Sequence, residues 1–376
     1  MTVGTGEVPW LPFLRAVIPP DITTVLEPVF ASGYVGAGRR VREFEHALEA
    51  YLGAPQVLCT SSCTAALTLA YVQLGVRPGD VVLSTPITCA ATNVPLIHLG
   101  ATIVWIDVDA GAGNVTPATL DAAFRAWPHA RAAVVVDWAG TPCDYAGLDT
   151  VARAHGAHVV LDAAQSFGST SRGSLLPSVG DFICYSFGPT KMLSSVEGGA
   201  VISRDAGAAE AIEAARWYGV ERDARSPLEF WDYDIVNPGY RFITNDVFAT
   251  VGVYMLQRLA SRLATHRELA ALYRGELERV PGLDIAAVPS DVDPNYWMFT
   301  VTAERRSDLL RKLHGAGIHA ATPHNRNDRL SCFRHLPAQD LPGATRFADT
   351  YLCLPIGPWV RLEDCARVCA TIRSGW

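Results

Sequence analysis

The chain has 376 residues, too many for one ordinary hydrophobic core, so two domains are expected. A hydrophobic content of 49% with 18% charged residues is typical of a globular protein, and a net charge of −7 argues against a nucleic-acid partner. No apolar stretch approaches the length of a membrane span and the N-terminus lacks a signal peptide, which together predict a cytoplasmic protein with no membrane partner.

The nine cysteines are scattered along the chain, without a C-x-x-C pair or a matching histidine spacing. A zinc site is therefore not expected. Several of the cysteines lie inside apolar runs, and we expect these to be buried free thiols of the kind found in a reducing compartment.

Alternating strand and helix signals run through the first two thirds of the chain. After an extended, proline-containing segment, helices are expected at about 22–32 and 40–52. Seven short apolar runs then predict strands, at 57–59, 81–84, 102–107, 132–136, 158–161, 182–185 and 199–203. Helices are expected between them, at 89–99, 116–127 and 148–155 among others, and another at 206–217 follows the last strand. This rhythm predicts an α/β fold with a doubly wound, mostly parallel sheet of seven strands flanked by helices.

Beyond residue 217 the pattern changes. Residues 218–244 predict a long loop, and loops of this length in compact domains usually carry function. A long amphipathic helix is expected from about 246 to 280, with a break near 264. A smaller α/β unit follows, with strands at 283–287, 296–302 and 319–322 and helices at 307–315 and 362–373. We therefore expect an extended segment (1–20), a large domain (21–255) and a small C-terminal domain (256–376).

Polar residues gather where two neighbouring strands are expected to end. Asp162 and Gln165 follow one strand, and Ser186, Thr190 and Lys191 follow the next. Open α/β sheets bind their ligands at this edge. A carboxylate and a lysine placed this way fit pyridoxal phosphate, because lysine forms a Schiff base with it and an acidic residue pairs with its ring nitrogen. Spacing alone fits a surface lysine and a helix-capping aspartate equally well.

A second polar group stands where the first strand of the sheet turns into a helix. Ser61, Ser62 and Thr64 occupy this junction. Free amide groups and the positive end of the helix dipole make such a junction a phosphate site. Ordinary capping of the helix is the alternative explanation for the same hydroxyl residues.

Several stretches, taken in their order and spacing, resemble the DegT/StrS-type sugar aminotransferases, a family within fold-type I of the pyridoxal-phosphate enzymes. The resemblance extends from about residue 10 to the C-terminus, and HNRNDRLSCF (324–333) looks like a feature of one subgroup. It rests on SGYVGAGRRVREFE (32–45), SSCTAALTLA (61–70), GATIVWIDVD (100–109), LDAAQSFGS (161–169), SFGPTKML (186–193), EGGAV (197–201) and GYRFITND (239–246).

The resemblance implies a role for each matching residue. Lys191 is expected to bind the cofactor covalently and to move a proton during the reaction. Asp162 is expected to keep the ring nitrogen protonated, and Gln165 to reach the ring hydroxyl. The phosphate is expected to lie against Ser62, Thr64, the backbone of Cys63, and Ser186.

Some positions depart from the family pattern. The family usually has glycine at Cys63 and, at Cys89, an aromatic residue that stacks on the cofactor ring. It usually has histidine near Asp137, so Asp137 and Trp138 are expected close to the cofactor, with Trp138 as the candidate for the missing ring contact. Arg241 replaces a common asparagine in a loop that, in this family, reaches the phosphate of the partner subunit.

The implied activity is the transfer of an amino group from glutamate or glutamine to a keto sugar, most simply one linked to a nucleotide, in amino-sugar or antibiotic biosynthesis. A keto-cyclitol is the alternative acceptor. The dehydratases of the family have histidine at the lysine position, so Lys191 argues against that activity. Because Cys63 and Cys89 depart from the family pattern, a further alternative is a regulatory protein that binds the cofactor without catalysing a reaction.

The composition of the loop at 218–244 favours a homodimer with shared active sites. Aromatic residues and arginine are concentrated at the cores of protein interfaces. Besides Arg241, the loop carries Trp231, Tyr233, Tyr240 and Phe242. The alternative is that these residues fold back over their own domain as a lid.

Overall fold

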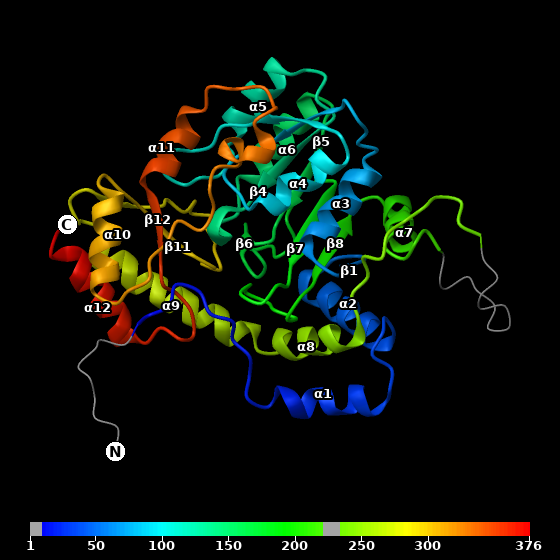
Figure 1. The fold of residues 1–376 in the computed structure, drawn as a ribbon, viewed down its shortest axis with the longest axis horizontal. Coiled ribbons are helices and arrows are strands. Elements are labelled where there is room, and N and C mark those ends of the chain that lie inside the picture. The colour runs from blue at the N-terminus through cyan, green and yellow to red at the C-terminus, as the bar shows by residue number, and fades with distance from the viewer. Residues whose placement is uncertain (1–9, 221–233) are drawn as a thin grey trace.

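A seven-stranded sheet forms the centre of the larger part of the molecule in this computed structural model, which describes residues 10–220 and 234–376 (Figure 1). The strands lie in the order β1-β8-β7-β5-β4-β2-β3. Their bounds are β1 (Leu58–Thr60), β2 (Val81–Ser84), β3 (Thr102–Trp105), β4 (Ala132–Val136), β5 (His158–Asp162), β7 (Phe182–Ser186) and β8 (Gly199–Ser203). β8 pairs antiparallel with β1 and β7, and the remaining pairs are parallel, so the predicted mostly parallel sheet is confirmed.

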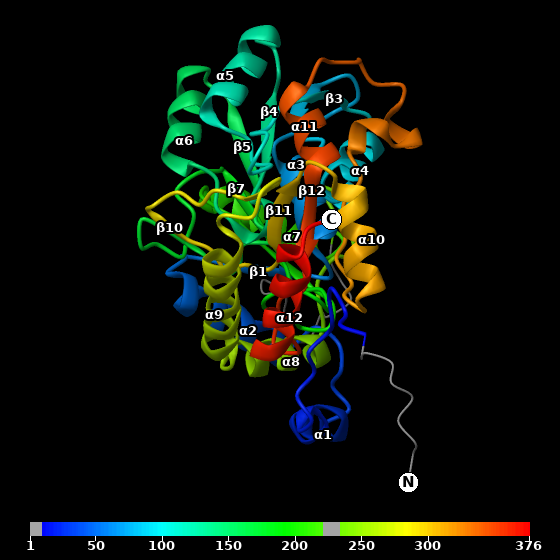
Figure 2. The same cartoon turned by 90° about the vertical axis from the view of Figure 1, so that its left-hand side faces the viewer.

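Helices cover both faces of this sheet, which explains why its inner strands are apolar along their whole length. β4 consists of alanine and valine only, and all of its residues are buried. Figure 2 shows one pair of helices on each side of the sheet. These are α3 (Cys63–Gln73) and α4 (Ala90–His98) on one side, and α5 (Pro117–Ala126) and α6 (Tyr145–Ala154) on the other. The short 3-10 helix η1 (Trp138–Gly140) follows β4 directly.

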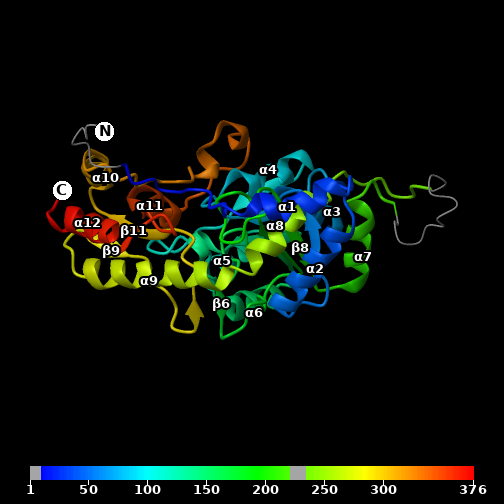
Figure 3. The same ribbon diagram turned by 90° about the horizontal axis from the view of Figure 1, so that it is seen from below.

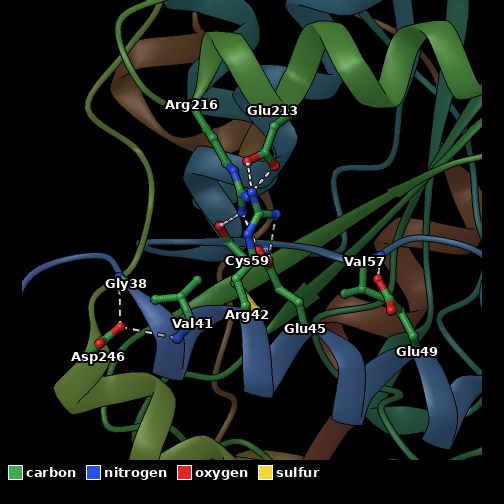
Figure 4. A network of polar contacts seen from close by, with 10 residues as sticks. All are labelled: Gly38, Val41, Arg42, Glu45, Glu49, Val57, Cys59, Glu213, Arg216 and Asp246. Carbon is green, nitrogen blue, oxygen red and sulfur yellow. Dashed lines mark hydrogen bonds and ion pairs between the residues drawn. The ribbon is translucent and has the colours of Figure 1, made fainter. Parts of the chain in front are cut away.

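The described residues of the larger part form four further helices: α1 (Ile22–Ala31), α2 (Arg39–Leu52), α7 (Ala206–Ala215) and α8 (Asp246–Leu256). α8 packs against both α1 and α2, and the view from below shows these three helices together (Figure 3). A buried polar network fastens α2 and the end of α7 to β1 (Figure 4). In it, Arg216 donates to Glu45, to Glu213 and, at 2.7 Å, to the carbonyl oxygen of Cys59.

The smaller part contains a three-stranded antiparallel sheet in the order β12-β11-β9, covered by helices. Its strands are β9 (Leu283–Ile285), β11 (Phe299–Ala303) and β12 (Tyr351–Leu354), and its helices are α9 (Leu259–Leu277), α10 (Arg306–Gly315), α11 (Pro342–Thr350) and α12 (Leu362–Arg373). The two-stranded pair of β6 (Thr170–Ser171) and β10 (Val292–Asp293) connects the two parts. Two short 3-10 helices, η2 (Asn327–Arg329) and η3 (Ser331–Phe333), lie between α10 and α11.

Two expectations for this part were wrong. The predicted strand at 319–322 forms only an isolated bridge between Ala321 and Cys353, and the third strand of the sheet is β12, whose four apolar residues are fully buried against β11. The long helix is interrupted at 257–258, not near 264. The break falls there because α8 packs on α1 and α2, whereas α9 turns its Leu269, Tyr273 and Leu277 into a different core.

Within the described residues, the buried apolar side chains form two clusters. The larger one surrounds the seven-stranded sheet, and side chains from the C-terminal part, including Phe347 and Tyr351, complete it. The second lies between the three-stranded sheet and α9, α10 and α12. The residue boundaries of the domains remain a prediction, and the first nine residues lie outside the described part.

No helix within 10–220 or 234–376 combines the length and the apolar composition that are needed to cross a bilayer.

Candidate active site

The topology brings the predicted site residues to one edge of the large sheet. Asp162 is the last residue of β5 and is paired with Cys184 on β7, and Ser186 is the last residue of β7. Gly199, the first residue of the antiparallel strand β8, is paired with both Ser186 and Thr60. The ends of β1, β5 and β7 therefore meet at this edge, as expected for the ligand-binding edge of such a sheet.

Asp162 has a carboxylate that is buried and held by uncharged donors. It is 4% exposed and accepts hydrogen bonds from Thr92 Oγ1 at 2.7 Å and the Ala164 amide at 3.0 Å, and the Cys63 thiol lies 3.9 Å away. Burial raises the pKa of Asp162, and the bond from Thr92 is the main opposing effect. Among the described residues no arginine or lysine forms an ion pair with it, so a cationic ring nitrogen would find a suitable partner here.

Lys191 lies in the turn after β7; its side chain is half-buried, and its amine is close enough to the Asp162 carboxylate for their charges to interact. Its Nζ is 3.6 Å from the centre of the Trp297 ring. Burial lowers the pKa of Lys191, and the Asp162 carboxylate opposes this shift. A lysine amine with a lowered pKa spends more time uncharged, which is the form that attacks a carbonyl carbon.

The N-terminus of α3 forms the third side of the site. Ser62 caps this helix, because its Oγ accepts a hydrogen bond from the Ala65 amide at 3.1 Å. The capping explanation for this hydroxyl is therefore confirmed. The first-turn amides of a helix, here those of Cys63 and Thr64, have no acceptor within the helix and favour an anion. A Cβ atom at Gly199 would lie 2.5 Å from the Cys63 nitrogen, so glycine allows β8 to pack directly against this helix end. Across this strand, Ser186 Oγ accepts from the Gly188 amide at 3.4 Å.

Gln165 and Asp137 both form hydrogen bonds inside the protein. Gln165 Oε1 accepts from the Ala139 amide at 2.7 Å, so its amino group is the end of the side chain that can donate to a ligand, and its contact with a ring hydroxyl remains a prediction. Asp137 is fully buried and accepts from the Cys143 amide, the Tyr145 hydroxyl and the Ser166 hydroxyl. These donors come from the loop after β4, from the start of α6 and from the segment after β5, and a direct contact of Asp137 with the cofactor remains a prediction.

Trp138 lies in the interior of the protein. It is 1% exposed, and its indole nitrogen donates to Thr300 Oγ1 at 3.3 Å. Its ring meets Phe347 and Tyr351 edge to face. The ring is therefore packed on the C-terminal part of the chain, and a contact of Trp138 with the cofactor ring remains a prediction. Cys89 itself is exposed and stands immediately before α4.

Arg241 is exposed and lies on a segment that runs beside β1. Its guanidinium carbon is 3.9 Å from the centre of the Trp217 ring. The next residue, Phe242, accepts a hydrogen bond from the Ser61 amide at 2.5 Å. A contact of Arg241 with a partner subunit remains a prediction, and Trp231 and Tyr233 lie outside the described residues.

Three residues of the site were not predicted as site residues from the sequence: Thr92, Trp297 and His324. His324 meets the Trp138 ring edge to face at 5.7 Å, and its Nε2 is buried without a partner in the described residues. Burial and the nearby Lys191 lower the pKa of His324 to about 4, so its imidazole is neutral at pH 7. A threonine, a tryptophan and a histidine carry no local signal of such a role, although His324 lies in one of the segments singled out above.

Comparison with known proteins agrees with this geometry. The model of the DegT/DnrJ/EryC1/StrS aminotransferase family matches residues 18–373. The chain belongs to this family. The sugar aminotransferase CalS13 from Micromonospora echinospora is 35% identical, with a TM-score of 0.91 over 97% of this chain and 100% of that one. DesV from S. venezuelae, whose crystal structure is a complex with a ketimine intermediate, is 29% identical, with a TM-score of 0.90 over 98% of each chain.

A curated relative gives the same result by sequence. The spore coat polysaccharide biosynthesis protein SpsC of Bacillus subtilis is 30% identical over 94% of this chain and 93% of its own length. The family and the fold-type I architecture predicted from the sequence are thus confirmed, and the chain is placed among the sugar aminotransferases.

Proposed function

We propose that this member of the family uses pyridoxal phosphate to move an amino group from glutamate or glutamine to the keto group of a nucleotide-linked sugar. The observation that carries the proposal is the buried carboxylate of Asp162 with the half-buried Lys191 close enough to interact with it, both set beside the N-terminus of α3. These three features fit the ring nitrogen, the aldehyde carbon and the phosphate of this one cofactor.

Each residue has a distinct task in this reaction. When bound, the cofactor supplies an electron sink for the bonds of the substrate carbon. Asp162 holds a proton on the ring nitrogen, and the hydrogen bonds from Thr92 and Ala164 orient its carboxylate. Lys191 binds the cofactor covalently and, once released, carries a proton between the substrate carbon and the cofactor. Its lowered pKa suits both tasks, because a proton carrier works best when its pKa is near the ambient pH.

The cofactor and its attachment can be tested by borohydride reduction, which fixes a lysine-bound cofactor permanently. The chain has two lysines, Lys191 and Lys312, and Lys312 donates instead to Ser374 near the C-terminus. We expect the reduced adduct on Lys191 in the wild type and in the Lys312→Ala control, and none in Lys191→Ala. An adduct on Lys312, or no adduct in the wild type, would contradict the proposal.

The acceptor can be identified by incubating the enzyme with glutamate or glutamine and a panel of 3-keto sugar nucleotides, 4-keto sugar nucleotides and keto-cyclitols. We expect an aminated nucleotide sugar and a stoichiometric amount of the keto acid. If only a keto-cyclitol is aminated, the proposed aminotransferase activity stands and the proposed acceptor changes to a keto-cyclitol. Loss of a sugar hydroxyl would indicate a dehydratase. Absence of any turnover in protein that binds the cofactor would indicate a regulatory homologue.

We further propose a homodimer with shared active sites, working in the cytoplasm. Large apolar side chains are exposed near α1 and in the segment before α8, with Phe30 at 58%, Tyr34 at 68% and Val236 at 81%. Exposed apolar groups of this kind favour burial in an interface. All nine cysteines are free thiols, which suits a reducing compartment.

A further inference from the structure

Trp297 links the segment between β10 and β11 to the turn that carries Lys191. It lies between β10 and β11, is 4% exposed, and donates from its indole nitrogen to the carbonyl oxygen of Thr190 at 2.8 Å. Thr190 precedes Lys191, so this bond fixes the plane of the indole ring relative to the lysine turn. The Lys191 amine rests 3.6 Å from the centre of that ring, which is the arrangement of a cation–π contact.

The backbone of Trp297 is held just as firmly from the other side. Its amide donates to Asn295 Oδ1 at 2.8 Å, and Asn295 Nδ2 donates to the carbonyl oxygens of Gln165 and Phe167. Tyr296, between them, has a φ of 49°, a left-handed conformation that is uncommon for residues other than glycine. Such a conformation persists only where the surroundings enforce it, and it is found most often at functional sites.

The groups that surround the Lys191 amine have opposing effects on its protonation. Asp162 favours the charged amine, and burial opposes it. The thiols of Cys63 and Cys89 and the neutral imidazole of His324 also lie close enough to interact. The electron-rich face of an indole attracts a cation. Trp297 therefore favours the charged form of the Lys191 amine, as Asp162 does, whereas burial favours the uncharged form.

We propose that Trp297 is a positioning residue for Lys191: its indole face receives the amine whenever Lys191 is not bonded to the cofactor, and it favours the charged form of that amine. This inference rests on the proposed function, in which Lys191 is released each time the cofactor takes up an amino group. A released amine needs a defined position, because a free lysine side chain has many rotamers and returns to the reacting carbon more slowly.

The scarcity of lysine allows a direct test on the full-length, cofactor-free protein and on its complex with pyridoxamine phosphate. Lysine labelled with carbon-13 at Cε gives two side-chain resonances, and their shifts across a pH series report the two pKa values. In Trp297→Leu we expect the pKa of Lys191 to fall by about one unit, the size of a desolvated cation–π contact, with that of Lys312 unchanged. Trp297→Phe keeps a smaller aromatic face, so the pKa of Lys191 in this variant should lie between its values in Trp297→Leu and in the wild type.

The matched control is Trp359→Leu. Trp359 also donates its indole nitrogen to a carbonyl oxygen, that of Pro12, but has no lysine on its ring among the described contacts. We expect this variant to leave the pKa of Lys191 unchanged. If Trp297→Leu fails to fold, the comparison of Trp297→Phe with the wild type decides.

A pKa of Lys191 that is equal in the wild type and the folded Trp297 variants would overturn the inference. That outcome is separate from the proposed function, because the titration does not depend on attachment of the cofactor to Lys191. A borohydride adduct on Lys191 together with an unchanged pKa would refute only the role of Trp297. A shifted pKa without an adduct would support that role and refute the proposed function.

Discussion

At the scale of single residues, the charge of Asp162 decides whether the site can stabilise a protonated ring nitrogen. Asp162→Asn keeps the shape of the side chain and removes its charge. We expect the half-reaction with glutamate to slow by at least about 100-fold, because loss of an electrostatic contact at a reacting centre usually has an effect of this size. Thr92→Val, which removes the 2.7 Å bond to the carboxylate, should slow it by about tenfold. Stopped-flow absorbance measures both rates, and activity of Asp162→Asn within about threefold of the wild type would contradict the assigned role.

Asp137 gives a pH-dependent prediction. Burial raises the pKa of this carboxyl to about 6 from 3.8, while bonds from Ser166, Tyr145 and Cys143 oppose the shift. Between these two values the native protein binds more protons than the unfolded chain, so the contribution of Asp137 to stability falls as the pH rises. We expect the wild type to lose about 1.5 kcal/mol relative to Asp137→Asn between about pH 5 and pH 7, measured by urea unfolding. Parallel stability profiles for the two proteins would rule this out.

At the scale of elements, the contact of β8 with the N-terminus of α3 shapes the expected phosphate site. Gly199→Ala would place a Cβ 2.5 Å from backbone atoms of Ser62 and Cys63, so the helix end must move. We expect the affinity for pyridoxal phosphate to fall about tenfold or more, because a hydrogen bond to a charged group is lost. Gly275→Ala on α9, where the added Cβ meets nothing within 4 Å, is the control and should keep the affinity of the wild type. Fluorescence titration with the cofactor compares the variants, and equal affinities would show that this contact does not shape the site.

At the scale of the whole molecule, shared active sites predict recovery of activity in mixed dimers. Lys191→Ala and Arg241→Glu are each expected to be inactive, but a mixed dimer would contain one site with both native residues. Because half of randomly reassociated dimers are mixed, activity should return to about a quarter of the wild-type value. Lys191→Ala mixed with Asp162→Asn is the control, since both residues belong to one chain's site and no recovery is expected. Absence of recovery in the first mixture, with subunit exchange demonstrated, would exclude sharing through Arg241.

The sequence by itself determined the features that depend on short stretches of chain. Apolar runs of three to six residues between polar or glycine-containing turns predicted all seven strands of the large sheet. The position of Asp162 at the end of β5, and of Lys191 in the turn after β7, followed from where those runs stop. Local patterns suffice here because parallel strands buried on both faces must be apolar along their length and place their following loops at one edge.

Only the tertiary structure decided which distant segments meet. β12 was missed because periodicity alone cannot tell a four-residue apolar run from a helix segment, and its pairing with β11 spans about fifty residues of sequence. Thr92 reaches Asp162 from α4, and Trp297 reaches Lys191 from beyond β10. Trp138 is buried against Phe347 and Tyr351, residues more than 200 positions further along the chain. Such contacts depend on how helices and sheets pack together, and side-chain type and spacing along the chain do not record that packing.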